Sequence, residues 1–349
     1  MPKAAKKVVC HLVGYGERIG AVRSLSVTLF CQSCHCCQST LLFKHKVSLY
    51  IMHSYPSSSR FEYCALMESF HHTTSTLPSG AVVHTWSPSS PQPLRATIVL
   101  QHGFGEYAER YVARYNELIP RLAVRGFEIK ALDLIGHGRS PGIVRGVCDI
   151  RKAVQDHLQI RRNALQERKN VSMFLVGHSL GGLVTAGSVA ADGENVRGVI
   201  LMGPAFPATM PSIVRYALAV PAYLIPSWPI PSKRSPPSEL SRIPEIGRLA
   251  EEDPMMSKQS ISYLLAVTAL DVAEDVRQGY TTWEIPTLVM RGTADNSTDV
   301  KACKEFIEGI KSKDKKMSLY EGGKHELLND LPRDKALNEI LDWLEVHLE

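Results

Sequence analysis

The chain of 349 residues is long enough to fold as one large α/β domain or two small ones. Its hydrophobic fraction of 44% and charged fraction of 21% are ordinary for a globular protein. The net charge of +5 comes from residues 1–60, which hold eight Lys or Arg and one acidic residue. Residues 61–349 hold 32 basic and 34 acidic residues and are nearly neutral. A nearly neutral body excludes a basic nucleic-acid-binding protein, and we expect no nucleic-acid partner.

Residues 1–75 form an extension that we predict to be disordered. A mitochondrial-type targeting segment and a misplaced translation start, with initiation at Met52 or Met67, are the alternatives. Residues 31–37 contain four Cys and one His, but no second pair follows at the spacing of a zinc ribbon or finger. We therefore predict no metal site. Two cysteines remain in the body, too few for a disulfide framework, which indicates a reduced, intracellular domain.

From about residue 76 the chain alternates between short apolar runs and helix-like segments. The predicted strands are residues 80–86, which has an edge-strand pattern, 95–101, 127–132, 172–176, 196–202, 286–291 and 316–320. The predicted helices are residues 111–124, 149–166, 180–191, 261–279, 299–310 and 335–348. This alternation is typical of a mostly parallel sheet with helices on both faces, so we predict one α/β domain over residues 76–349.

The alternation stops after the strand that ends near Met202. Residues 204–237 hold nine of the 21 prolines, which cannot continue a central sheet. The apolar stretch at residues 213–230 is too interrupted by proline for a transmembrane helix. We predict a lid insertion over about residues 204–280 that admits an acyl chain and contacts a membrane surface. The alternative is a second packed core layer.

Gly177-His178-Ser179-Leu180-Gly181 follows an apolar strand and precedes a helix, which is the pattern of a G-x-S-x-G nucleophile elbow. Small residues two before and two after the serine let the backbone turn sharply. The serine then stands at a helix N-terminus, where the N–H of Leu180 can face a developing oxyanion. We predict Ser179 as a catalytic nucleophile; the alternative is a plain structural turn.

A serine hydroxyl is a weak nucleophile until a histidine accepts its proton and a carboxylate orients that histidine. In an elbow of this kind the acid and the histidine follow the serine, each on a loop after a later strand. His325 lies in a glycine-bearing loop after the predicted strand 316–320, so we predict it as the base. His347 lies in the terminal helix, where we expect it to face solvent. Three histidines precede or flank Ser179 and are poor candidates: His102, His137 and His178.

The loop after the predicted strand 286–291 offers two carboxylates, Asp295 and Asp299. Asp299 suits the N-terminal turn of the next helix, where a carboxylate stabilises the helix end. We therefore predict Asp295 as the acid.

An oxyanion needs a second N–H donor, which should come from the loop after the predicted strand 95–101. That loop reads His102-Gly103-Phe104-Gly105, and its glycines permit a close backbone approach, although glycines are also ordinary turn formers. We predict Phe104 N–H and Leu180 N–H as the oxyanion hole.

Five motifs occur in a fixed order along the chain. They are HGFGEYAERY from His102, DLIGHGRS from Asp133, GHSLGG from Gly177, RGTAD ending at Asp295 and YEGGKH ending at His325. Together they resemble the monoacylglycerol lipase/lysophospholipase branch of the α/β-hydrolases over residues 78–349. The resemblance implies an α/β-hydrolase fold, cleavage of a monoacylglycerol or lysolipid ester, and no metal or organic cofactor. It does not cover residues 1–75, and the proline density of the insertion departs from the family pattern.

Two other functions remain open. One keeps the triad but acts on small acyl compounds, as a carboxylesterase, thioesterase or lactonase. The other is a non-catalytic receptor that uses a hydrolase pocket to bind a ligand. An epoxide hydrolase or dehalogenase is disfavoured, because that chemistry needs Asp where Ser179 stands. We expect a cytoplasmic protein, peripheral on membranes or lipid droplets, whose partner is a small lipid or acyl ester.

Overall fold

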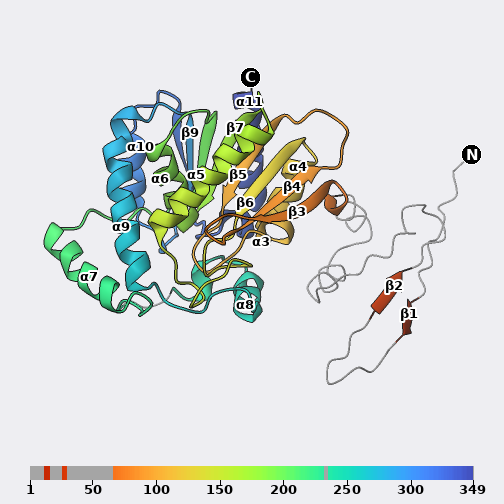
Figure 1. Cartoon of the computed structure of the whole chain (residues 1–349). Coiled ribbons are helices and arrows are strands. Elements are labelled where there is room, and N and C mark those ends of the chain that lie inside the picture. Colours follow the sequence, from red (N-terminus) through yellow and green to blue (C-terminus); the bar gives the residue numbers. More distant parts are fainter. Residues whose placement is uncertain (1–11, 16–25, 30–65, 232–234, 349) are drawn as a thin grey trace, which may run out of the picture. The chain divides into compact units, whose positions relative to one another are not determined.

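The computed structural model describes residues 12–15, 26–29, 66–231 and 235–348. Contacts divide the chain into two units, Met1–Cys64 and Ala65–Glu349 (Figure 1). In the first unit, β1 (Leu12–Tyr15) and β2 (Ser26–Leu29) pair antiparallel. The cysteine-rich residues 31–37 lie outside the described residues, as does most of the segment for which we predicted disorder or targeting.

The second unit is built on a sheet that has eight strands in the described residues, in the order β10-β9-β8-β7-β5-β6-β4-β3. The strands are β3 (Phe70–Thr76), β4 (Val82–Pro88), β5 (Ala96–Gln101), β6 (Phe127–Leu132), β7 (Ser172–His178), β8 (Gly198–Met202), β9 (Thr287–Gly292) and β10 (Lys315–Tyr320). β4 pairs antiparallel with β3 and β6, and the other pairs are parallel. The predicted α/β-hydrolase fold with a mostly parallel sheet is confirmed.

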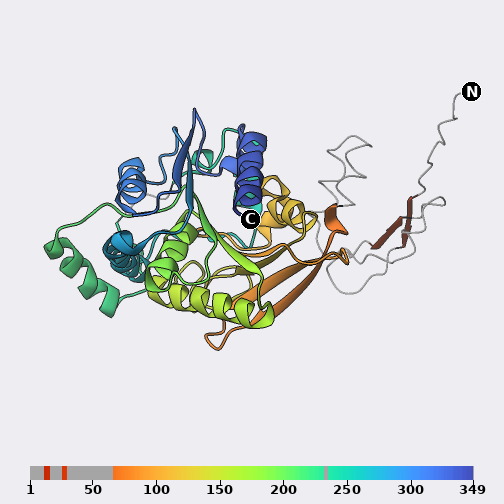
Figure 2. The same cartoon turned by 90° about the horizontal axis from the view of Figure 1, so that it is seen from above.

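Helices cover both faces of this sheet because side chains of the central strands alternate between two apolar cores (Figure 2). In β5, Val99 joins one core and its neighbours Ile98 and Leu100 join the other. The first core is covered by α5 (Ile150–Glu167), α6 (Leu180–Ala191), α9 (Tyr263–Gln278) and α10 (Val300–Gly309). The second is covered by α3 (Arg110–Ala113), α4 (Leu118–Ala123) and α11 (Arg333–Leu348).

The sheet begins before residue 76, where we predicted the domain to start. β3 occupies Phe70–Thr76 and forms the edge strand, so β4 lies inside the sheet rather than at its edge. The sequence of β3 is polar, and its residues after Phe70 are all exposed. Such a strand lacks the apolar alternation from which strands are predicted.

The helix predicted at residues 111–124 is interrupted. A 3-10 turn, η2 (Tyr115–Glu117), separates α3 from α4, and its three residues have φ between 52° and 53°. The N–H of Tyr115 donates to Asn329 Oδ1 at 2.6 Å, so a distant segment stabilises the break. Helical spacing alone cannot reveal such a tertiary contact.

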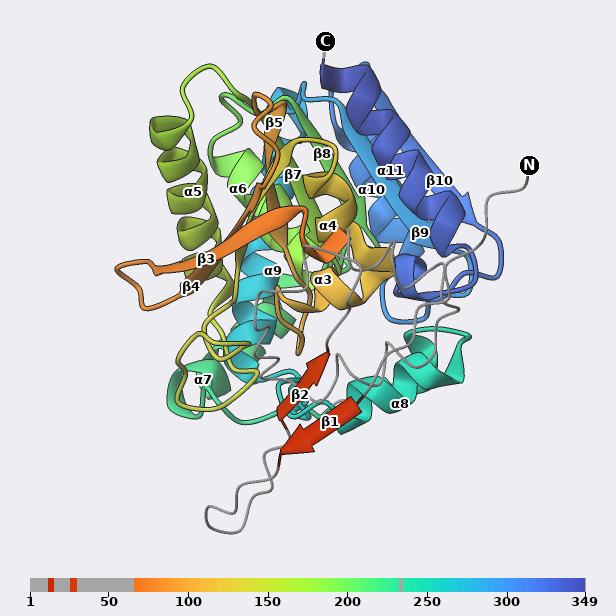
Figure 3. The ribbon, with the colours of Figure 1, turned by 90° about the vertical axis from the view of Figure 1, so that its right-hand side faces the viewer.

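The insertion after β8 contains α7 (Ser212–Leu224), η3 (Pro237–Glu239) and α8 (Pro244–Glu252), and α7 and α8 lie at one end of the sheet (Figure 3). The predicted lid extends to residue 280, but α9 packs against α6, and its Leu265, Val272 and Val276 are buried in the core. Among the described helices, none combines the length and apolar character needed to cross a bilayer.

Candidate active site

Ser179 forms the turn between β7, which ends at His178, and α6, which begins at Leu180. Its φ of 54° and ψ of −119° are unusual for a residue with a side chain, and such conformations concentrate at functional sites. Backbone hydrogen bonds support the turn: Ser179 N–H donates to Met202 O, and Ser179 O accepts from Ala205 N–H, each at 2.9 Å. A Cβ on Gly181 would clash with the carbonyl oxygen of Gln101, so the close approach requires glycine here.

Asp295 and His325 form a buried hydrogen-bonded pair. Asp295 follows β9 and His325 follows β10, and Asp295 Oδ2 lies 3.0 Å from His325 Nδ1. Asp295 also accepts from Ser297 N–H at 2.7 Å and from the Thr298 hydroxyl at 2.8 Å. Burial alone would raise the pKa of Asp295, but the hydrogen bond and charge of His325, with those two donors, lower it from 3.8 to about 2. An ionised carboxylate only accepts, so the proton sits on Nδ1 and leaves the Nε2 lone pair available.

The elbow and this pair meet at Gly203, directly after β8. A Cβ on Gly203 would lie 3.4 Å from both Asp295 Oδ2 and His325 Nδ1. The ring of His325 lies 4.9 Å from the ring of His178, the residue before Ser179. The structure therefore gathers the predicted nucleophile, base and acid at the carboxyl ends of β7, β9 and β10.

The two rejected candidates are held in helices by other contacts. Asp299 caps α10, where its Oδ1 accepts from Lys301 N–H at 2.8 Å. His347 stacks on Trp343 in α11, and its Nε2 lies 2.9 Å from Asp314 Oδ2. We expected His347 to face solvent, but only 11% of its side chain is exposed, because the indole ring covers it.

The glycine loop packs directly against the elbow. A Cβ on Gly103 would lie 3.0 Å from Ser179 Cβ, so only glycine allows this contact without displacement. Phe104 follows in the loop, half-buried, with its ring edge-on to His137 at 5.8 Å. Leu180 opens α6, and the first N–H groups of a helix have no intrahelical partner. The predicted donors Phe104 and Leu180 thus directly follow Gly103 and Ser179, the two residues that meet here.

The histidines that we set aside are buried. His102 donates from Nδ1 to Gly103 O at 2.8 Å and accepts at Nε2 from Leu134 N–H at 3.1 Å. Burial lowers the pKa of His137 to about 3, so it is neutral at physiological pH. His137 Nδ1 lies 3.2 Å from Ile135 O, so both rings are held by backbone groups of buried loops.

A buried network centred on Glu106 was not predicted. Its carboxylate accepts hydrogen bonds, at 2.7 to 3.0 Å, from Gly103 N–H, Arg110, Tyr111, Tyr115 and His178. Burial opposes its charge, yet the hydrogen bond and charge of His178 and the charge of Arg110 hold the pKa of Glu106 well below its usual range. The same contact raises the pKa of His178, although burial acts in the opposite direction.

This network joins three loops of the site. Glu106 contacts the glycine loop and His178 of the elbow, while Arg110 Nη1 lies 3.1 Å from Glu326 Oε1, next to His325. Glu106 and Arg110 lie four residues apart, but Glu106 stands in the loop before α3, so their contact does not follow from helical spacing. The third partner, Glu326, lies 216 residues from Arg110, and only the fold reveals it.

The insertion is hydrogen-bonded to loops on both sides of the site. On one side, His325 N–H donates to Glu239 O at 3.3 Å and Glu326 N–H donates to Leu240 O at 2.8 Å. On the other, Ser257 N–H donates to Gly105 O at 2.7 Å. Residues 239–257 therefore bridge the histidine loop and the glycine loop.

Comparisons with known proteins find hydrolases that are similar to this chain. The family model Hydrolase_4, described as serine aminopeptidase, S33, matches residues 92–332. Monoglyceride lipase of Rattus norvegicus is 29% identical over 264 residues, which cover 74% of this chain and 84% of that protein. Monoacylglycerol lipase of Mycolicibacterium smegmatis is 28% identical over 271 residues, which cover 76% of this chain and 93% of that protein. The crystal structure of Paleococcus ferrophilus monoacylglycerol lipase matches with a TM-score of 0.65 and 28% identity, covering 80% of this chain and 99% of that one.

Proposed function

We propose that this chain cleaves monoacylglycerols through Ser179, His325 and Asp295. The chain belongs to the Hydrolase_4 (serine aminopeptidase, S33) family of α/β-hydrolases and is an ester hydrolase. The observation that carries the proposal is the buried Asp295–His325 hydrogen bond of 3.0 Å beside the strained turn at Ser179. The relatives named monoglyceride or monoacylglycerol lipase support the substrate class.

In the first step, His325 Nε2 takes the hydroxyl proton of Ser179 while Oγ attacks the ester carbonyl carbon. The carbonyl oxygen becomes an oxyanion, which accepts hydrogen bonds from Phe104 N–H and Leu180 N–H. His325 then gives its proton to the departing glycerol oxygen, and the acyl group stays on Ser179. Asp295 stabilises the imidazolium throughout.

In the second step, water replaces glycerol in the same site. His325 removes a proton from the water, whose oxygen attacks the acyl carbon. The tetrahedral intermediate collapses, the C–O bond to Ser179 breaks, and His325 returns the proton to the serine oxygen. The products are a fatty acid and the restored enzyme.

We propose that the insertion binds the acyl chain of the substrate. α7 exposes apolar side chains, and residues 239–257 are joined by hydrogen bonds to both loops that flank Ser179. An apolar surface on the same insertion suits a long acyl chain better than a small polar ester. The alternative is a carboxylesterase, thioesterase or lactonase of small acyl compounds. Because the chain is an ester hydrolase, we set aside the non-catalytic receptor.

The test compares the wild type with Ser179→Ala in two assays, fatty-acid release from monooleoylglycerol and labelling by a fluorophosphonate probe. We expect the variant to lose at least about 10⁴-fold of turnover and all labelling, since the nucleophile is gone. Ser90→Ala, on an exposed turn, is the matched control and should behave as the wild type. Unchanged labelling of Ser179→Ala would reject Ser179. A series of glycerol, thiol and aryl esters from acetyl to oleoyl then separates a lipase from a small-ester esterase.

A further inference from the structure

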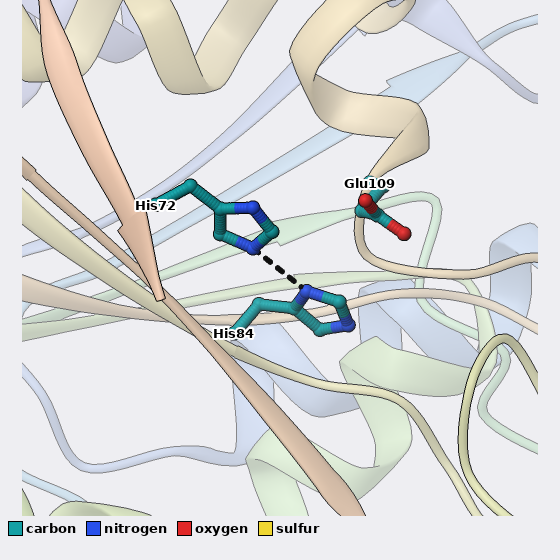
Figure 4. A group of neighbouring side chains, drawn as sticks. All are labelled: His72, His84 and Glu109. Carbon is teal, nitrogen blue, oxygen red and sulfur yellow. Dashed lines mark hydrogen bonds between the residues drawn. The ribbon is translucent and has the colours of Figure 1, made fainter. Parts of the chain in front are cut away.

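We propose that His72, His84 and Glu109 form a binding site for a divalent transition-metal cation such as Zn²⁺ at the β3 edge of the sheet. The three residues each offer one ligand atom, and these atoms all lie within 4.8 Å of one another (Figure 4). Two imidazoles and one carboxylate are a recognised ligand set for Zn²⁺. The sequence predicts no metal site, because only residues 31–37 suggest one and no second ligand pair follows them.

The sheet register places the two imidazoles side by side. β3 and β4 pair antiparallel with Thr74 opposite His84 and His72 opposite Trp86, so the histidines are diagonal neighbours on one face. His72 Nε2 lies 3.0 Å from His84 Nδ1, and the rings face each other in Figure 4. Two nitrogens bound to one Zn²⁺ at tetrahedral angles lie about 3.3 Å apart. The exposed His72 must therefore rotate away from its hydrogen bond with His84 to admit the cation.

The buried partner of His84 fixes which nitrogen carries the lone pair. His84 Nε2 lies 3.1 Å from Asp133 Oδ2. The same carboxylate accepts from Ala108 N–H at 2.8 Å and from Arg139 N–H at 2.7 Å. A carboxylate that accepts from these groups also accepts from Nε2–H, so Nδ1 of His84 presents its lone pair toward His72. Metal-binding histidines are typically oriented by such a carboxylate on the opposite nitrogen.

Glu109 supplies the third ligand from the N-cap of α3. It forms an ion pair with Arg139, with Nε to Oε2 at 2.7 Å and Nη2 to Oε1 at 3.0 Å. Each carboxylate oxygen has a second lone pair, so Glu109 can bind a cation without leaving Arg139. The exposure of His72 lets water take a fourth position. Nitrogen ligands favour Zn²⁺ over Mg²⁺, which prefers oxygen ligands.

A cation at this site would join the edge strand to the rest of the domain. It would connect β3 through His72 to β4 through His84 and to the start of α3 through Glu109. A ligand that binds only the native protein adds its binding free energy to stability. We therefore expect Zn²⁺ to raise the unfolding temperature.

The experiment titrates the full chain with Zn²⁺ by calorimetry and measures unfolding temperatures with and without the metal. His72→Ala should bind one Zn²⁺ fewer than the wild type and lose the corresponding increase in unfolding temperature. His71→Ala is the matched control, because adjacent strand residues point to opposite faces and His71 is also exposed. Zinc bound by the cysteines of residues 31–37 would be the same in both variants. Glu109→Gln should weaken the site at least about tenfold, and Mg²⁺ should not bind there.

Equal Zn²⁺ stoichiometry and equal temperature shifts in His72→Ala and His71→Ala would overturn the site. Unchanged affinity in Glu109→Gln would overturn the assignment of three ligands. The His72 ring stacks on Trp86 at 4.8 Å and contacts His84, so His72→Ala can lower the unfolding temperature even without metal. The metal effect is therefore measured in each variant as the shift between metal-free and Zn²⁺-loaded protein, which separates loss of the cation from loss of these ring contacts.

Discussion

Ser179 and Asp295 illustrate how the fold maintains residues in states that are unfavourable in isolation. The backbone of Ser179 has a positive φ, which costs on the order of 1–3 kcal/mol for a residue with a side chain. Asp295 keeps its charge although it is buried, because three donors outweigh the loss of water. Both residues depend on contacts from neighbouring strands and loops, so the reactive geometry exists before substrate binds.

At Asp295, replacement by Asn should remove most activity while the fold persists. Asn offers an amide in place of a carboxylate, so it no longer selects the Nδ1–H tautomer of His325 or stabilises the imidazolium. We expect kcat on monooleoylglycerol to fall by about 10³ to 10⁴-fold.

Asp299→Asn is the matched control, because Asp299 lies in the same loop but caps α10. It should cost no more than about 1 kcal/mol of stability and leave kcat unchanged. A large loss of kcat in Asp299→Asn, with activity kept in Asp295→Asn, would exchange the two assignments.

The same carboxylate makes stability depend on pH in the acidic range. The pKa of Asp295 is lower in the folded protein, at about 2, than its ordinary 3.8. Its stabilising contribution, about 2 kcal/mol, is therefore complete above the ordinary pKa and is lost as the pH falls through the folded value. Urea unfolding of the wild type and Asp295→Asn should give a difference in free energy that shrinks from about pH 5 toward pH 2. A difference that stays constant over that range would contradict the lowered pKa.

At the scale of elements, α7 stands out because its apolar residues are exposed. The side chains of Ile213, Tyr223 and Leu224 are 68% to 87% exposed, and Trp228, just after the helix, is 64% exposed. Leu218, in the middle of the helix, is half-buried. Exposed apolar side chains concentrated in one element mark a surface that binds a lipid or another apolar partner.

We expect α7 to bind membranes. Replacing Tyr223, Leu224 and Trp228 together by Ser should reduce co-sedimentation with phosphatidylcholine vesicles by at least about tenfold, because each such side chain contributes about 1.5–3 kcal/mol when buried. The unfolding temperature should hardly change, since these side chains are exposed.

Val346→Ser is the control for this surface. Val346 is 73% exposed in α11, outside the insertion, and its replacement should leave vesicle binding intact. Equal sedimentation of the triple variant and the wild type would reject a membrane role for α7.

Elements whose signal is local were predicted well, and those that depend on distant contacts were not. The residue bounds of β6 and α6 match the predictions, because each has a continuous apolar or helical pattern between clear boundaries. α9 was assigned to the lid, since nothing in its sequence shows that its apolar face packs on α6. The break at η2 depends on Asn329, more than 200 residues away.

At the scale of the whole molecule, chain order was the strongest predictor of the site. Placing the acid and the base after Ser179, each at the end of a later strand, selected Asp295 and His325, which the fold brings together. The supporting network of Glu106, Arg110 and Glu326 was missed. Glu106 and Arg110 lie four residues apart around the start of α3, but Glu326 follows β10, and no sequence spacing connects it with them.

The domain boundary provides a last test at this scale. β3 pairs with β4 along its whole length, and Trp86 and His84 of β4 are buried to 1% and 0% exposure beside it. A chain shortened to begin at Ala65 retains β3, whereas one that begins at Pro78 lacks it.

We expect the chain that begins at Ala65 to keep the unfolding temperature and esterase activity of its domain. The chain that begins at Pro78 should lose at least about 3 kcal/mol, because Trp86 becomes exposed and β4 becomes an unprotected edge that promotes aggregation. Thermal unfolding and light scattering of both chains measure these effects. Equal stability of the two would show that β3 is dispensable and would place the functional boundary at residue 76, where the sequence pattern begins. A loss of stability confined to the chain that begins at Pro78 would place the functional boundary before Phe70. The polar edge strand β3 would then be part of the hydrolase domain.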